Sequence, residues 1–270
     1  MALKDITLGQ YFPGNSPVHR LDPRAKLISV ICYIVALFLA KWWVTYGIML
    51  LVLVLAVKIS TVSPKAIVRG MKPVVFLLVF TAVLNVLYYP GAHEICSFWV
   101  FTISWEGIRH AFLMVVRIMM LLSCTFLLTY TTSPLDLTDG MESLMSPLKA
   151  IHVPVHELSM MMSIALRFIP TLIEETDKIM SAQRARGADF DSGNLIQKAK
   201  ALIPLLVPLF VSAFRRADEL ATAMECRCYH GGEGRTRLKQ LHCRPADWGV
   251  MAAFLALCVV IGVLGRRFGL

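Results

Sequence analysis

Long apolar runs separated by short charged or aromatic stretches dominate this chain, and such runs predict helices that cross a membrane. A helix needs about 20 apolar residues to span a hydrocarbon core about 30 Å thick. The first two runs are short for this, but Lys41, Trp42 and Trp43 between them suit a membrane interface at the turn between two antiparallel helices. We therefore expect about five transmembrane helices, at residues 27–40, 46–57, 73–89, 108–130 and 248–264.

The stretch between the fourth and fifth runs is too polar to cross a membrane and too apolar for a linker. Three segments in it, 133–151, 155–186 and 194–228, repeat apolar residues at the helical i, i+3, i+4 spacing. We expect an all-α membrane protein in which about three amphipathic helices form a coupling region between the last two spans. The expected domains are a membrane region at 1–132, this region at 133–246 and a final span at 247–270.

Composition and charge support a membrane protein and set its orientation. Hydrophobic residues make up 57% of the chain, against about 45–50% in soluble domains. Lysine and arginine give a net charge of +9 and gather before the first run and between the second and third, whereas residues 90–106 contain neither. By the positive-inside rule, the N-terminus and residues 131–247 are cytoplasmic and the C-terminus is outside, although Arg266 and Arg267 oppose that last assignment.

The second and third amphipathic segments end alike, at an offset of 41 residues. Ala185-Arg186-Gly187 in the second corresponds to Cys226-Arg227-Cys228 in the third, so each helix ends in an arginine between two small residues. A guanidinium is a planar fork of donors that matches a carboxylate, and small neighbours let a partner approach closely. Two such ends predict docking to a dimer of related subunits. The alternative is that the arginines only complement the negative ends of their helices.

Three stretches carry a family resemblance: residues 8–27, which include Leu21-Asp22-Pro23-Arg24, residues 182–187, and residues 217–229. Together they resemble, over nearly the whole chain, the transmembrane T component of energy-coupling factor (ECF) vitamin transporters. The wording of the first stretch is similar to the shared kind of T component more than to the dedicated cobalt or nickel kind. The usual motif is Ala-Arg-Gly at both helix ends, so the second end, Cys226-Arg227-Cys228, departs from it.

The resemblance implies a multi-subunit importer in a bacterial cell membrane. Two related ABC-type ATPases bind the helix ends through Ala185, Arg186, Gly187, Cys226, Arg227 and Cys228, and an exchangeable S component binds the vitamin. ATP binding then draws the two ends together and moves the S component. Methionines suit a surface that repacks against different partners, which favours a docking face at Met141, Met145, Met160, Met161 and Met162, with core packing as the alternative. ATP and Mg²⁺ belong to the ATPases, so this chain is expected to be non-enzymatic and without cofactors.

Other functions have weaker support in the sequence. Arg117 lies in the fourth run and is a candidate functional residue; either it pairs with a polar group such as Asn85, or its helix tilts along the membrane surface. An autonomous channel or secondary carrier would need more polar spans or broken helices, and an intramembrane enzyme would need paired ionisable groups. We expect no metal site, because Cys226 and Cys228 are closer in sequence than the usual zinc-binding pairs. We expect no nucleic-acid partner either, since the basic residues flank apolar runs.

Overall fold

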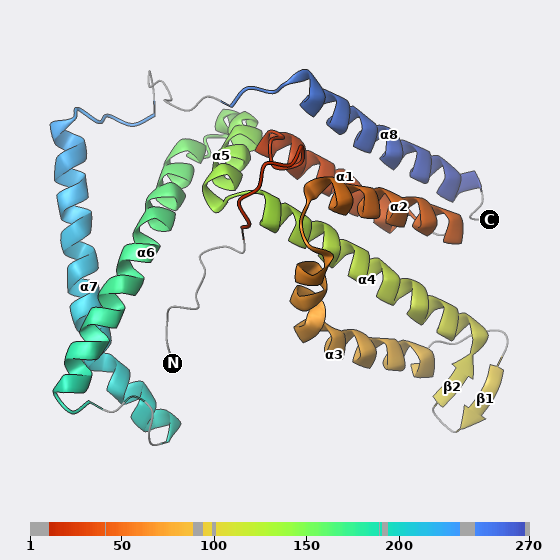
Figure 1. Ribbon diagram of the computed structural model, residues 1–270, viewed down its shortest axis with the longest axis horizontal. Helices are drawn as coiled ribbons and strands as arrows, with labels where there is room; N and C mark the ends of the chain where they lie inside the picture. Colours follow the sequence, from red (N-terminus) through yellow and green to blue (C-terminus); the bar gives the residue numbers. More distant parts are fainter. Residues whose placement is uncertain are drawn as a thin grey trace. The chain divides into compact units, whose positions relative to one another are not determined.

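The computed structural model describes residues 11–40, 42–88, 94–98, 101–188, 190, 194–232 and 241–267. These residues are mainly helical (Figure 1), which confirms an all-α membrane fold. The helices are α1 (Pro23–Leu39), α2 (Trp43–Ser60), α3 (Pro64–Tyr88), α4 (Trp105–Thr131), α5 (Pro134–Met145), α6 (Val155–Ala185), α7 (Leu195–Cys226) and α8 (Pro245–Arg267), with the 3-10 helix η2 (Ser146–Ile151) after α5.

Four helices, α2, α3, α4 and α8, are long and apolar enough to cross a membrane. Helix α1 has 17 residues, and at 1.5 Å per residue it extends about 26 Å, slightly less than the hydrocarbon core. The prediction of about five spans is therefore confirmed for four of them. The orientation of the termini stays a prediction.

A small antiparallel hairpin of β1 (Glu94–Phe98) and β2 (Phe101–Ser104) precedes α4. The sequence pattern did not predict it, because each strand is too short for its alternation to stand out in an aromatic connection. Ser104 then begins α4, since its side-chain hydroxyl accepts a hydrogen bond from the backbone N–H of Gly107 at 3.0 Å. Capping the first turn in this way satisfies a backbone donor that has no partner within the helix.

The chain divides into two compact units, one made of described residues up to Met141 and from Leu241 onward, the other of those from Glu142 to Gly232. The first unit holds the candidate spans around a core of Tyr33, Leu37, Met49 and Ile261. In it α1 packs mainly on α8, and α3 packs mainly on α4. The predicted domain boundaries, 1–132, 133–246 and 247–270, stay a prediction.

Within the first unit, the described part of the N-terminal stretch fixes the start of α1 against the end of α4. Lys26 is buried, and its ammonium group donates to the backbone oxygens of His19 at 3.2 Å and Thr131 at 2.8 Å, and to the hydroxyl of Thr132 at 3.3 Å. A buried charge is tolerated only when hydrogen bonds replace its hydration. These bonds therefore explain why an apolar run is preceded by a lysine that faces inward.

The same stretch also holds the start of α8. Asp247 lies in its first turn, and its buried carboxylate accepts hydrogen bonds from the backbone N–H groups of Asp22 at 3.0 Å and Arg244 at 2.6 Å. The Asp22 carboxylate in turn accepts from the backbone N–H of Arg24 at 2.9 Å and so caps α1. Residues 11–27 thus anchor three helices of the membrane unit at one level.

In the second unit, α6 and α7 pack against each other but enclose little apolar surface. Among its described residues, Val155 and Leu205 are the only buried apolar side chains. Both helices nevertheless carry a full apolar stripe. Exposed apolar surface of this extent is typical of a face that a partner or a membrane covers.

Candidate functional site

Helices α6 and α7 end in the same backbone geometry. Arg186 is the C-cap of α6, with φ −85° and ψ 4°, and Arg227 is the C-cap of α7, with φ −93° and ψ 15°. The duplication that the sequence predicts at an offset of 41 residues is therefore also a duplication in structure.

Two hydrogen bonds close the last turn at each end in the Schellman arrangement, which satisfies carbonyl groups left over at a helix C-terminus. The N–H of the second residue after the arginine donates to the carbonyl of the residue three positions before the arginine. The N–H of the first residue after the arginine donates to the carbonyl of the residue two positions before the arginine. The N···O distances are 2.9 Å (Ala188 to Gln183) and 3.0 Å (Gly187 to Arg184) in α6, and 3.1 Å (Tyr229 to Met224) and 2.8 Å (Cys228 to Glu225) in α7.

The residue after each arginine has a left-handed backbone, which explains the usual glycine of the motif. Gly187 has φ 89° and Cys228 has φ 55°. A side chain in this region costs roughly 1–2 kcal/mol, because its Cβ crowds the backbone. The cysteine at the second end therefore strains the backbone without altering the cap.

The six predicted ATPase-binding residues, Ala185 to Gly187 and Cys226 to Cys228, are all exposed. The guanidinium groups of Arg186 and Arg227 form no hydrogen bond or ion pair with another described residue, and only the backbone N–H groups of the two arginines are bonded, within their own helix ends. A Cβ added to Gly187 would meet no atom within 4 Å, so nothing in the described chain covers that end. Within the described chain, the structure presents two unpaired guanidinium groups, each on a hydrogen-bonded helix end.

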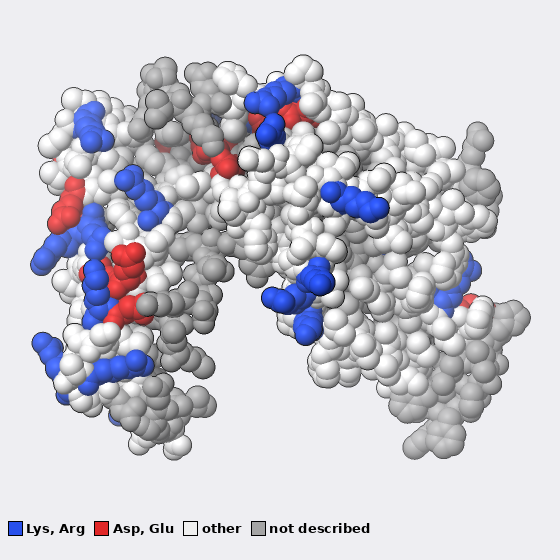
Figure 2. Space-filling view, in the orientation of Figure 1, with Lys and Arg blue, Asp and Glu red and all other residues white. Residues whose placement is uncertain are grey.

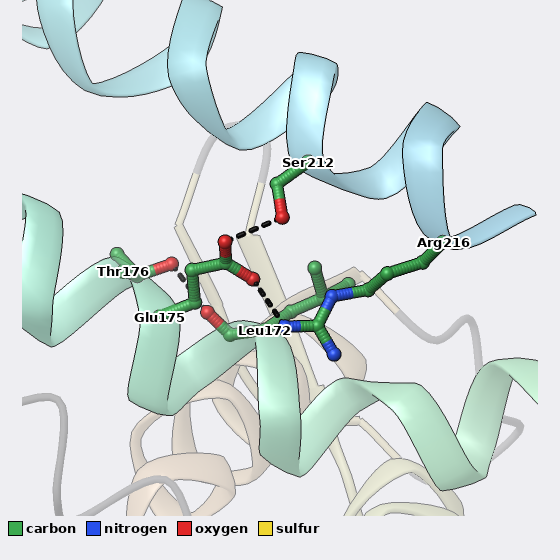
Figure 3. A network of polar contacts seen from close by, with 5 residues as sticks. All are labelled: Leu172, Glu175, Thr176, Ser212 and Arg216. Atoms are coloured by element: carbon green, nitrogen blue, oxygen red, sulfur yellow. Dashed lines mark hydrogen bonds and ion pairs between the residues drawn. The ribbon is translucent and has the colours of Figure 1, made fainter. Parts of the chain in front are cut away.

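A polar network joins α6 to α7 part way along their length (Figure 3). Glu175 on α6 accepts a hydrogen bond from the hydroxyl of Ser212 on α7, and Arg216 donates to its other carboxylate oxygen at 2.9 Å. The Ser212 hydrogen bond, together with the positive charge of Arg216, lowers the pKa of Glu175 below its ordinary value of 4.5. The contact therefore favours the charged form of the carboxylate over the protonated form.

This network lies at corresponding positions of the two helices. Glu175 and Arg216 are 41 residues apart, the same offset that relates the two arginine ends, and each lies 11 residues before its arginine. At 1.5 Å per residue, the contact is about 16 Å along either helix from its end. The parts of α6 and α7 beyond this contact thus form two arms of equal length, and a second contact, from the Gln183 side chain to the Pro204 carbonyl at 3.4 Å, also joins the two helices.

The predicted methionine face is only partly exposed. Met141 on α5 and Met161 and Met162 on α6 are exposed, whereas Met145 and Met160 are half-buried. Packing in the core of the described chain therefore does not explain why Met141, Met161 and Met162 are methionines. Whether an S component covers them stays a prediction.

A second apolar row was not assigned to a binding site from the sequence. It runs along α7 and consists of the exposed residues Ile203, Leu206, Val207, Phe210, Val211 and Phe214. The helical spacing in the sequence predicts an amphipathic helix but does not show what covers its apolar face. Burial in the described chain shows that these side chains are exposed rather than packed in its core.

Arg117 has a structural partner, but it is not Asn85. Its guanidinium donates to the hydroxyl of Tyr46 at 2.8 Å and to the carbonyl of Ala40, the C-cap of α1, at 3.3 Å, and it lies 5.8 Å from the centre of the Phe38 ring. Asn85 instead donates to the Thr81 carbonyl at 2.9 Å. Arg117 therefore fastens the α1–α2 turn to α4.

The remaining sequence candidates add no further site. Among the described residues, no group of three metal-binding side chains comes together. Cys226, Cys228 and Cys243 are free thiols there. Residues 8–10 of the N-terminal stretch lie outside the described residues.

Comparison with known proteins places this geometry in context. A family model described as cobalt transport protein (CbiQ) matches residues 14–238. Proteins named energy-coupling factor transporter transmembrane protein EcfT are similar over almost their whole length. The identity is 52% over 266 residues with that of Clostridium kluyveri (98% of each chain), and 51% over 267 residues with that of Thermosediminibacter oceani (98% of this chain, 99% of the relative). The resemblance predicted from the sequence is thereby confirmed.

Proposed function

Because this chain belongs to the family of energy-coupling factor transporter transmembrane proteins, we propose that it couples ATP use by two partner ATPases to movement of a vitamin-binding S component. As the transmembrane component of a multi-subunit transporter, it is a non-catalytic subunit. The observation that carries the proposal is the pair of matching helix ends, each with an exposed arginine at its C-cap whose guanidinium is unpaired among the described residues.

In this proposal, Arg186 and Arg227 each insert into an acidic groove of one ATPase. The Schellman caps support it, since they fix the backbone of each helix end before binding and so reduce the entropy lost on docking. The small neighbours Ala185, Gly187, Cys226 and Cys228 leave the backbone open to close approach. Two equivalent ends suit two related ATPases that carry ATP and Mg²⁺ between them.

The transmitting element in this proposal is the crossed pair of α6 and α7. When ATP binding closes the ATPases, the two ends approach each other, and the contact at Glu175 and Arg216 turns that approach into rotation of the arms. The S component rests on the methionine face and on the exposed row of α7. This step fails if ATP binding leaves the distance between labels at Ala188 and Tyr229 unchanged.

The test of docking is co-purification of the ATPase pair from membranes with the wild type, Arg186→Ala, Arg227→Ala and the double variant. Truncating one member of a buried interfacial charge pair costs about 2–5 kcal/mol, roughly 30-fold to several-thousandfold in affinity. Each single variant should lose much of the ATPase, and the double variant nearly all of it.

Arg215→Ala is the matched control, because Arg215 is an exposed arginine of α7 that lies away from the helix end. It should retain both ATPases and transport normally. If all the variants retain the ATPases and support transport, the arginines only complement their helix ends and the proposal is wrong.

A further inference from the structure

Helix α3 carries one exposed stripe that changes from cationic to apolar along its length. Lys65, Arg69 and Lys72 are exposed and spaced four and three residues apart, which places them on one helix face. The same face continues after Lys72 with four exposed apolar side chains, at Phe76, Val79, Phe80 and Val83. Phe76, which is 80% exposed, lies four residues after Lys72. The stripe therefore changes from cationic to apolar over about one helical turn.

The opposite face of α3 fixes the direction of this stripe. Ile67 and Met71 are buried in a cluster with Leu127 and Tyr130 of α4. The cationic residues therefore face away from the protein core and cannot turn inward without breaking that packing.

No protein carboxylate neutralises the stripe from nearby in the sequence, since residues 23–93 contain no aspartate or glutamate. Within the described part of the chain, Lys65, Arg69 and Lys72 form no ion pair or side-chain hydrogen bond. Figure 2 shows a group of basic side chains over the first half of α3 with no acidic side chain beside it. Three like charges at this spacing repel one another, so an anion from outside the chain would stabilise them.

The dimensions of the stripe fit a lipid in one leaflet of the membrane. From Lys65 to Lys72 the helix rises about 10 Å, and from Lys72 to Val83 about 16 Å. The second length is close to half of a hydrocarbon core about 30 Å thick. Pro73 lies inside the helix between the two parts. Proline kinks helices, and Figure 1 shows that α3 bends.

We propose that this stripe is a binding site for an anionic glycerophospholipid. Lys65, Arg69 and Lys72 bind the phosphodiester headgroup, and the acyl chains lie along Phe76 to Val83. The apolar continuation favours a lipid over a soluble phosphate, which has no group to cover the exposed Phe76. It also favours a lipid over an acidic protein, whose charged surface would lie against four apolar side chains.

The experiment titrates the purified full-length chain in detergent with short-chain phosphatidylglycerol, phosphatidylcholine and inorganic phosphate, and counts bound lipids by native mass spectrometry. Basic residues near an anionic headgroup contribute roughly fivefold in affinity each. The wild type should therefore prefer phosphatidylglycerol, and the triple variant Lys65→Gln, Arg69→Gln, Lys72→Gln should bind it about a hundredfold more weakly.

The control variant Lys149→Gln, Lys178→Gln, Arg215→Gln removes the same charge from exposed positions elsewhere and should bind like the wild type. A second variant, Phe76→Ser, keeps the cations and should weaken phosphatidylglycerol binding while leaving any binding of inorganic phosphate unchanged. It keeps the proposal testable if the triple variant does not fold.

Three results would overturn the proposal. Equal loss in the control variant would mean a general charge effect, and competition by inorganic phosphate as strong as by the lipid would mean a simple anion site. Loss of bound phosphatidylglycerol on assembly with the partner subunits would mean that α3 is a protein interface.

Discussion

Gly187 and Cys228 show that a left-handed backbone favours glycine at a position but does not require it. Both follow a docking arginine, and both have positive φ, yet only one of them is the glycine that this conformation favours. The hydrogen bonds of the two caps are nonetheless alike. The helix end therefore keeps the same cap hydrogen bonds despite the backbone strain at Cys228.

Exchanging these residue types should move the stability of the two caps in opposite directions. Gly187→Ala adds a Cβ that meets no atom within 4 Å, so its cost is backbone strain alone, about 1 kcal/mol, or roughly fivefold in the equilibrium between closed and open cap. Cys228→Gly removes similar strain. Amide hydrogen exchange of Ala188 should quicken in the first variant, and that of Tyr229 should slow in the second. Equal rates in wild type and both variants would contradict the assignment.

The crossing of α6 and α7 depends on a few polar contacts, because these helices bury so little apolar surface against each other. Glu175 is the central group, as it accepts hydrogen bonds from both Ser212 and Arg216. Its lowered pKa means that the folded chain favours the carboxylate more than the unfolded chain does. The stabilisation is therefore complete above about pH 4.5 and is lost as the pH falls through the lower, folded value.

A double-mutant cycle should show this coupling directly. Glu175→Gln and Arg216→Gln are each expected to loosen the crossing, and their coupling energy should be about 0.2–1 kcal/mol at neutral pH. It should be smaller at pH 3 than at neutral pH, because Glu175 takes up protons as the pH falls towards its lowered pKa. The measurement is the distance distribution between labels on α6 and α7. A coupling energy that is the same at both pH values would exclude an ionic crossing.

The sequence predicted these elements well where the signal is local and poorly where it depends on distant residues. The apolar periodicity placed α6 and α7 almost to their observed ends, and the repeated arginines located both caps. The partners of Arg117 were missed because Tyr46 and Ala40 are 71 and 77 residues away. The left-handed backbone of Cys228 was also missed, since a cysteine in place of glycine gives no local sign of it.

At the scale of the whole molecule, the exposed row of α7 allows docking of the S component to be tested separately from docking of the ATPases. Phe210 and Phe214 are exposed and lie before the arginine end, so their loss should not affect the fold or the ATPases. Phe210→Ser with Phe214→Ser should reduce co-purification of the S component by about tenfold or more, given roughly 25 cal/mol per Å² of apolar area. ATPase retention should match the wild type. Normal retention of the S component would assign this row to the membrane.

The most direct test of the account is whether the ATPases cover both helix ends. Cys226 is an exposed native thiol beside Arg227, and Ala185→Cys places a thiol at the equivalent position beside Arg186. Alkylation rates of both are measured with and without the ATPase pair, with Cys243, which precedes α8, as the internal reference. If both ends dock, bound ATPases should slow alkylation at both ends and leave Cys243 unchanged. Undiminished alkylation of both thiols in a complex that contains the ATPases would contradict it.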